Sequence, residues 1–500
     1  MSAQEYENIQ SPKIEFDIGE EKKALFPSGD GQQRIADYGY FEKLFEGDHF
    51  DAFKIKIDNK KFGEVYEKLK YIKVNIAGLL SKICADILFS EPPIITVKDG
   101  DQEFLDELLS SNKFFVQLYE SGLSNSYFGD AVFKIRIGKD HPSNPKENSR
   151  IIIEDITPTI YFPEIDPFNV RQTPEKIVLA WNFERGKDKY QRQEIHEIGK
   201  ITNKIFLIKG DEMIDVSASM LTELDLKDVE LTRVDFLLME HIPNWKTGRR
   251  YFGYSDYYDL DSLFYAINNR LSLVDSILDE HAEPLLTLPE GILDENGRVK
   301  REKLKMIEVP AGAGSDGKPE YIVWNASLES AFSEIDKLFE SLFMVSEISP
   351  DALGMGKGLS DSGRALKLKI MRTIAKITRK RLYYDQAIKD VLYKAQVLAK
   401  EWKIDINGKK LTKEPVRPDI KWADGLPIDD AEQVETEAKK IDAGLTSTAD
   451  AIMRIDGVDE QTAEAKAKKI QEEHQINMPT MDLGGKNPFS TPNPKEAPKK

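Results

Sequence analysis

Apolar residues recur at every third or fourth position over several long stretches of the chain, and this spacing predicts amphipathic helices. Residues 62–89 and 102–125 predict two such helices. Residues 256–281 and 328–349 predict a second pair, in which the apolar positions form one narrow stripe suited to packing beside another long helix. The stripe of the first helix consists of Leu260, Phe264, Ile267, Leu271, Val274 and Leu278, and that of the second of Leu328, Phe332, Ile335, Phe339 and Leu342.

Short apolar runs bounded by turn residues predict strands elsewhere in the chain. Four of these runs lie at residues 151–153, 159–162, 177–181 and 204–208. Two more, at 305–309 and 321–324, lie in a segment punctuated by glycine and proline that separates the two striped helices. The pattern therefore predicts an α+β protein in which a small β-rich module interrupts a pair of matched helices.

A third long helix, predicted over residues 364–402, is basic in its first half. That half has no acidic residue and eight basic ones, which are Arg364, Lys367, Lys369, Arg372, Lys376, Arg379, Lys380 and Arg381. Lys369, Arg372, Lys376 and Arg379 recur at helical spacing, so they share one face, and we call these four residues the basic strip. Like charges so placed repel each other unless an anion or an acidic partner faces them.

The C-terminal part changes character again. Residues 430–474 predict a few short helices separated by Gly444 and Gly457. From residue 475 onward the chain has five prolines and few large apolar residues, a composition that predicts disorder.

Composition narrows the classes of function. The formal net charge of -17 argues against broad, nonspecific affinity for nucleic acid, although it allows a local basic strip within an acidic body. No apolar run is long enough to span a membrane, and the N-terminus has no apolar signal core, so we expect folding in the cytosol and no membrane partner.

Candidate chemistry is sparse. Cys84 is the single cysteine, which excludes disulfide frameworks and predicts a buried small apolar side chain. The six histidines stand alone, without the paired spacing of a zinc site. Asp256, Asp259 and Asp261 lie near a predicted helix start, where they are interpreted as helix-capping residues rather than metal ligands. No metal and no cofactor are therefore expected.

The stretch 349–366, SPDALGMGKGLSDSGRAL, suggests a phosphate-binding loop at first sight. A Walker A loop needs glycine where Asp351 stands, a serine or threonine where Gly358 stands, and a preceding strand, whereas the segment before this loop predicts a helix. A dinucleotide-binding loop would need a glycine at Leu359. Two interpretations remain, a plain connector between helices and a mobile functional loop, and the second is favoured because three glycines cost ordering entropy.

A second basic cluster lies inside the predicted β-rich module. It consists of Arg298, Lys300, Arg301, Lys303 and Lys305. It is either a solvated face or a docking surface.

The order of these parts resembles that of the portal proteins of tailed double-stranded DNA bacteriophages, in particular those of long-tailed phages that infect Gram-positive bacteria. The resemblance covers about residues 35 to 475. It is carried by FEGDH at 45–49, DILFSEPP at 86–93, GYSD at 253–256, SGRALK at 362–367 and AGLTS at 443–447. Each motif is weak alone, and their order and spacing together make the resemblance specific.

The resemblance implies a portal fold with named domains. Residues 1–34 would be an N-terminal extension, 35–255 the first part of the wing, 256–283 and 328–349 the stem helices, 284–327 the clip, 350–362 the tunnel loop, 363–424 a long wing helix with its connection, 425–474 the crown and 475–500 a disordered tail.

The resemblance also implies the function. A ring of about twelve subunits at the unique capsid vertex would form the channel through which DNA is packaged and ejected, with the tunnel loop, Leu353, Gly354, Met355, Gly356, Lys357 and Gly358, at its narrowest part. The clip would dock the terminase large subunit and later the head-completion proteins, while wing and crown face major capsid and scaffolding proteins. The basic strip, together with Arg364 and Lys367, would face either DNA or an acidic surface of a neighbouring subunit.

In this interpretation the chain itself is not an enzyme, and its final location is the virion. Two alternatives stay open at the level of sequence. One is an ATP-dependent DNA-packaging motor or nuclease subunit, which would bind and hydrolyse nucleotide. The other is a capsid structural protein without a channel.

Overall fold

The computed structural model describes residues 23–56, 71–89, 91–139, 148–282, 285–289, 306–309, 320–322, 328–355, 365, 368–423, 430–458 and 460–476. The chain divides into two compact units, Met1–Gly425 and Leu426–Lys500. Helices and sheets share the first unit, so the predicted α+β class is confirmed. Within the described residues, no helix combines the length and the apolar character needed to cross a lipid bilayer.

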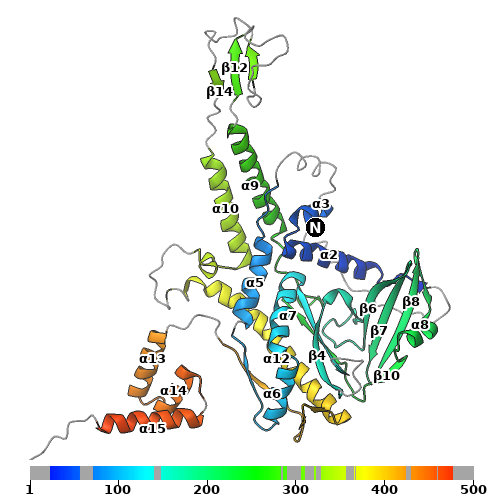
Figure 1. The fold of residues 1–500 in the computed structure, drawn as a ribbon, viewed down its shortest axis with the longest axis vertical. Helices are drawn as coiled ribbons and strands as arrows, with labels where there is room; N and C mark the ends of the chain where they lie inside the picture. The colour runs from blue at the N-terminus through cyan, green and yellow to red at the C-terminus, as the bar shows by residue number, and fades with distance from the viewer. Residues whose placement is uncertain are drawn as a thin grey trace, which may run out of the picture. The chain divides into compact units, whose positions relative to one another are not determined.

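The main core of the first unit lies between helices and a three-stranded sheet. Four helices, α2 (Gly29–Glu46), α5 (Ile76–Phe89), α7 (Phe114–Phe128) and α12 (Met371–Trp402), contribute buried apolar residues to it. The sheet has the order β11 (Met239–Pro243), β3 (Asp130–Gly138), β4 (Arg150–Ile156), and both pairs are antiparallel. Figure 1 shows α12 running past α5 and α7.

A larger antiparallel sheet adjoins this core (Figure 1). Its order is β1 (Lys23–Ala24), β9 (Glu212–Asp215), β8 (Lys200–Lys209), β7 (Asp188–Glu197), β6 (Lys176–Arg185) and β5 (Tyr161–Pro163), and β10 (Val229–Leu231) also pairs with β8. Ile205 of β8 is buried against Met220 and Leu221 of the short helix α8 (Ser217–Glu223). The buried residues of β6, 177–180, pack on two other small cores. Strand β1 pairs with β9, so this part of the segment predicted as an N-terminal extension belongs to the larger sheet. The boundary predicted at residue 34 falls inside the helix α2.

Smaller elements complete the first unit. The helices α3 (His49–Lys56) and α6 (Gln102–Ser111) flank the core, and short 3-10 turns cover Pro158–Ile160 and Pro350–Leu353. Strand β2 (Ile94–Thr96) pairs with β17 (Asp419–Lys421), and β15 (Asp405–Ile406) pairs with β16 (Lys409–Lys410).

The two striped helices are α9 (Asp261–Ala282) and α10 (Glu329–Ser346), and they lie side by side (Figure 1). Between them in sequence come β12 (Leu285–Pro289), β13 (Met306–Val309) and β14 (Glu320–Ile322). These strands form one sheet in the order β13-β12-β14, with β12 parallel to β13 and antiparallel to β14. The predicted β-rich module therefore forms within a few residues of its predicted strands.

The second unit consists of α13 (Asp430–Asp442), α14 (Thr448–Asp456) and α15 (Glu460–Ile476). Ser447 and Asp450 form a reciprocal capping box at the start of α14, and Gly457 ends that helix in the left-handed conformation with a φ of 65°. The chain divides after Gly425, and the assignment of residues 425–474 to a crown stays a prediction. The predicted disordered tail begins at residue 475, and residues 477–500 lie outside the described residues.

Three predicted helices differ from the structure. Residues 71–75 are not helical, because the amides of Ile72 and Val74 donate to Ser272 Oγ (2.9 Å) and Asn268 Oδ1 (3.0 Å) of α9, and the helix begins only at Ile76. The segment predicted as one helix over 102–125 is two helices, α6 and α7, because Lys113 takes a left-handed φ of 48° between them. The helix predicted over 364–402 is interrupted at Ile370: residues 365, 368 and 369 are helical, and α12 runs from Met371 to Trp402.

Candidate functional site

The basic strip of α12 faces carboxylates of its own chain. Lys369 pairs with Asp351 at 3.8 Å, Arg372 with Glu347 at 2.8 Å and Lys376 with Asp256 at 3.1 Å. Arg379 also pairs with Glu347. The sequence predicted DNA or an acidic surface of a neighbouring subunit as the partner, whereas within one chain the partners are carboxylates of the same chain.

Asp256 is the buried centre of this arrangement. Its side chain is 2% exposed, and its Oδ2 accepts hydrogen bonds from Lys380 Nζ (2.8 Å) and Ser126 Oγ (2.7 Å). Its Oδ1 lies 3.1 Å from Lys376 Nζ and accepts from Asn244 Nδ2 at 3.0 Å. Burial by itself would raise the pKa of Asp256, but the charges of Lys376 and Lys380 hold that pKa well below its usual range.

The prediction that Asp256 caps a helix is therefore wrong. The helix α9 starts at Asp261, which does lie in its first turn. Asp256 instead joins the segment before α9 to two turns of α12. Lys376 and Lys380 are also too deeply buried to reach DNA or a neighbour in this conformation, at 9% and 3% exposure of their side chains.

The end of α10 is held by the same face of α12. Lys376 Nζ donates to the backbone oxygen of Ser346 at 3.0 Å, where the helix leaves carbonyl groups without partners. Glu347 follows with a left-handed φ of 59°, which ends the helix and turns its carboxylate toward Arg372 and Arg379. The amide of Ser349 then donates to Thr373 Oγ1 at 2.8 Å. We call Asp256, Glu347, Lys376, Arg379 and Lys380 the stem-base clamp.

The predicted tunnel loop starts directly after this clamp. Pro350–Leu353 form a 3-10 turn capped by Ser349, and Gly354 ends it with a φ of 70°. Leu353 packs partly against the main core, whereas Met355 is exposed. Gly356, Lys357 and Gly358 lie outside the described residues, as do Arg364 and Lys367 of the predicted basic helix and the cluster Arg298, Lys300, Arg301, Lys303 and Lys305.

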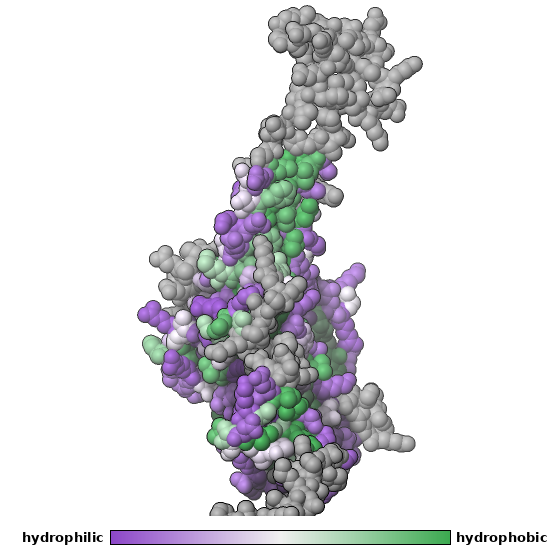
Figure 2. Space-filling model, turned by 90° about the vertical axis from the view of Figure 1, so that its left-hand side faces the viewer, coloured by the Kyte–Doolittle hydropathy of each residue, from purple (hydrophilic) through white to green (hydrophobic). Residues whose placement is uncertain are grey.

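The predicted stripes of the paired helices are buried at the end near the body and open farther along. Leu260, Phe264, Ile267, Val274, Ile335 and Leu342 are buried, and Leu271, Leu328 and Phe339 are half-buried. Leu278 and Phe332 are 45% and 50% exposed. Figure 2 shows apolar side chains gathered along one side of the paired helices. One chain therefore leaves part of the stripe uncovered.

The described residues were also compared with the geometry of a metal site. No group of three or more His, Cys, Asp or Glu side chains with metal-binding geometry occurs among those residues. Cys84 is buried in α5, as predicted, and burial raises the pKa of its thiol. The clamp is thus an arrangement of fixed charges that positions helices.

One signal for the clamp was present in the sequence. The GYSD motif at 253–256 ends in Asp256. At its first residue, Gly253, the backbone passes so close to Gly129 that a Cβ would lie 2.1 Å from the Gly129 backbone oxygen, so only glycine fits there. The motif therefore fixes the path of the chain that brings Asp256 to α12. The identity of its partners, Lys376 and Lys380, could not be obtained from the motif.

Comparison with known families agrees with this architecture. Residues 176–479 match the family model described as phage portal protein, SPP1 Gp6-like. The match covers more than half of the chain, so the chain belongs to this family of tailed-phage portal proteins. A search of curated proteins found no match.

Membership has general consequences. Portal proteins of this family are structural components of the virion capsid and assemble as oligomeric rings. The part of the stripe that one chain leaves exposed is consistent with such assembly.

Proposed function

We propose that this chain forms the ring-shaped channel at the unique vertex of a phage capsid, through which double-stranded DNA is packaged and later ejected. The phage would be of the long-tailed type that infects Gram-positive bacteria. The observation that carries the proposal is the pair α9 and α10, which lie side by side, enclose a β module in sequence and leave Leu278 and Phe332 exposed. A second copy of the chain in a ring would cover these side chains.

The domains follow from this proposal. Helices α9 and α10 are the stem, β12 to β14 belong to the clip, the unit from residue 426 contains the crown, and the remaining body is the wing. The tunnel loop leaves the stem directly after Glu347 and returns at the start of α12. The stem-base clamp then holds both ends of the loop against the body.

Partners are assigned by the same proposal. The terminase large subunit and then head-completion proteins dock on the clip, where the cluster Arg298, Lys300, Arg301, Lys303 and Lys305 supplies positive charge. Major capsid and scaffolding proteins contact the wing and the crown. Of the basic strip, Lys369, Arg372 and Arg379 keep exposed surface, so these three are the members that could meet DNA or a neighbouring subunit in addition to their intrachain carboxylates.

Electron microscopy of the purified protein tests the proposal directly. Rings with a central hole, of about twelve subunits, are expected. Monomers or open sheets would count heavily against a channel. The same preparation should neither bind nor hydrolyse ATP, whereas turnover of ATP would favour a motor subunit.

One variant distinguishes a role of the tunnel loop in DNA passage from a role in ring assembly. Lys357→Glu places a negative charge in the proposed tunnel loop, where it would repel passing DNA. We expect DNA packaging or retention to fall while ring assembly in electron micrographs is unchanged. Loss of rings in this variant would mean that the loop serves assembly instead.

A further inference from the structure

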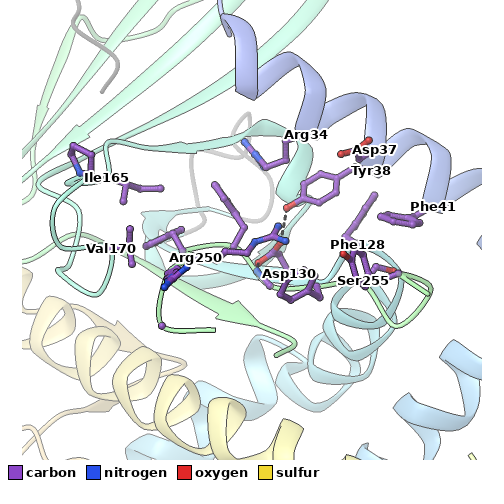
Figure 3. Close-up of a pocket in the computed structure, with 18 of the residues that line it drawn as sticks. Arg34, Asp37, Tyr38, Phe41, Phe128, Asp130, Ile165, Val170, Arg250 and Ser255 are labelled. Atoms are coloured by element: carbon purple, nitrogen blue, oxygen red, sulfur yellow. Dashed lines mark hydrogen bonds between the residues drawn. The ribbon is translucent and has the colours of Figure 1, made fainter. Parts of the chain in front are cut away.

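A cavity of about 370 Å³ in the first unit has no role in the proposed channel. It lies between α2, the loop 164–175 that joins β5 to β6, and the segment 244–260 that joins β11 to α9. Aromatic side chains form much of its wall. They are Tyr38, Phe41, Phe128, Tyr251, Phe252 and Tyr254. Figure 3 shows the residues that line it.

The wall of this cavity is held by a buried carboxylate. Asp130 is fully buried and accepts hydrogen bonds from Tyr38 Oη (2.6 Å), His241 Nε2 (2.7 Å) and the backbone amide of Gly253 (2.8 Å). Figure 3 shows Tyr38 pointing to Asp130 from α2. Three elements are thus tied together around one side chain, so the cavity is largely pre-formed.

Several cations gather around the cavity, and they outnumber the acids of its wall, Asp37 and Asp130. Within the described residues, Arg34, Arg171 and Arg249 form no ion pair with a carboxylate. Arg34 donates to the backbone oxygens of Pro158 (3.0 Å) and Tyr161 (2.6 Å), and its guanidinium lies 4.2 Å from the centroid of the Phe252 ring.

Two of these cations are near the surface. Arg249 lines the cavity and is exposed, and the guanidinium of Arg171 lies about 3.1 Å from where a Cβ of Gly248 would be. Lys246 is a fourth cation nearby: burial lowers its pKa, the charge of Asp130 opposes this effect, and the charge of Arg171 lowers the pKa further. In a chain with a net charge of -17, this is a local region of positive potential.

An ordered turn presents an apolar ring at the edge of the cavity. The amide of Phe168 donates to Asp166 Oδ1 at 2.8 Å, and the amide of Asn169 donates to the Asp166 backbone oxygen at 3.2 Å. The turn therefore fixes the backbone, yet the side chain of Phe168 is 98% exposed. A fixed and fully exposed phenylalanine beside an aromatic cavity is typical of a surface that a partner covers.

We propose that the cavity and Phe168 form a docking site for an acidic peptide segment of a partner protein. The segment inserts a large apolar side chain between the aromatic rings and places carboxylates beside Arg171 and Arg249. Nucleic acid fits less well, because its phosphates need cations along a groove, whereas these surround one cavity whose wall includes Asp37 and Asp130. The site does not rest on the channel, since it shares no residue with the stem stripes, the loop or the clamp.

Binding of a defined peptide tests this proposal on the full-length protein. The probe is a fluorescent seven-residue peptide with a central phenylalanine flanked by acidic residues, and two control peptides carry serine at the centre or lysine in the flanks. We expect saturable binding by fluorescence anisotropy that weakens as salt is added. The control peptides should bind at least about tenfold more weakly, because each lacks one of the two contacts.

Protein variants locate the site. Arg171→Glu combined with Arg249→Glu should abolish binding, and Phe168→Ser should weaken it. The matched control, Lys187→Glu combined with Lys209→Glu, reverses two exposed charges away from the cavity and should bind like the parent protein. All variants should still form rings if the parent does, so failure of the docking site and failure of the channel are told apart by electron microscopy.

Several results would overturn the proposal. They are no binding of the acidic peptide, equal binding of the serine or lysine peptide, and unchanged binding in the Arg171/Arg249 variant. Displacement of the probe by a DNA oligonucleotide at similar concentration would assign the surface to nucleic acid. Binding that appears only after residues 1–22 are removed would show that the chain covers the site itself.

Discussion

Asp256 shows how one buried carboxylate can decide the stability of this fold. It compensates two lysines of α12, and removing its charge leaves both cations buried without a counter-ion. We expect Asp256→Asn to lower the free energy of unfolding by about 3–5 kcal/mol. Denaturant unfolding measures the change, with Asp279→Asn, an exposed carboxylate of α9, as the control. If Asp256→Asn lowers the free energy of unfolding as little as Asp279→Asn does, the clamp does not stabilise the fold.

Asp155 has the opposite electrostatic situation. Burial, with a further contribution from the charge of Glu120, raises the pKa of Asp155 to about 8, and its Oδ1 accepts no hydrogen bond from the described residues. Because the folded state favours the protonated carboxyl, its stabilising effect is complete below the unfolded pKa of about 4 and is lost as the pH rises through about 8.

Asp155→Asn removes this pH dependence. The variant should be more stable than the parent at pH 8.5, by about 1–2 kcal/mol, because an amide does not ionise in the buried position. At pH 5 the difference should be smaller. Thermal unfolding at the two pH values measures it, and a gain of the same size at both would mean that ionisation of Asp155 is not the cause.

At the scale of elements, α12 holds the end of α10 through Glu347. Glu347→Gln keeps the size of the side chain and removes the charge that faces Arg372 and Arg379. Because the two arginines are largely exposed, we expect a loss of only about 0.5–1 kcal/mol in global stability. Amide hydrogen exchange at 346–349 and 371–376 should nevertheless become clearly faster. Glu340→Gln, which removes an exposed pair with Lys337 on the same helix, should leave that exchange unchanged.

The paired helices differ along their length, and this difference is testable. Ile335 is buried in one chain, so Ile335→Asp should cost several kcal/mol by burying an unpaired charge. Phe332 lies three residues earlier and is half exposed, so Phe332→Ser should change the thermal stability of an isolated subunit little. Differential scanning calorimetry of subunits at low concentration separates the two, and equal losses would contradict the observed burial.

At the scale of the whole molecule, Phe332 tests whether the exposed part of the stripe is an interface between subunits. If a neighbouring copy covers Phe332 in the ring, Phe332→Ser should shift the equilibrium from rings toward subunits although the subunit stays folded. Analytical ultracentrifugation of the variant measures this shift. Rings as stable as those of the parent would mean that this part of the stripe is not a subunit interface.

The sequence by itself determined the local elements and the family. The three-four spacing located the stripes of α9 and α10 to within a few residues of their starts, because amphipathic helices carry their burial pattern in the chain. The β module, the strands β4, β5, β6 and β8 and the short C-terminal helices with Gly444 and Gly457 followed in the same way, whereas β1, β7, β9 and β10 were not predicted. Glycine and proline end helices and form turns through local backbone effects, so these positions can be predicted from the sequence alone.

Only the tertiary structure decided what the elements face. The sequence showed that the basic strip needs a negative partner, and the fold supplied Asp256, which lies 124 residues before Lys380. It also kept residues 71–75 out of a predicted helix, because the amides of Ile72 and Val74 donate hydrogen bonds to Ser272 and Asn268, about two hundred residues away. The cavity beside Phe168 likewise combines α2 with two distant loops. Such contacts depend on which segments meet in space, and no periodicity within a single segment contains that information.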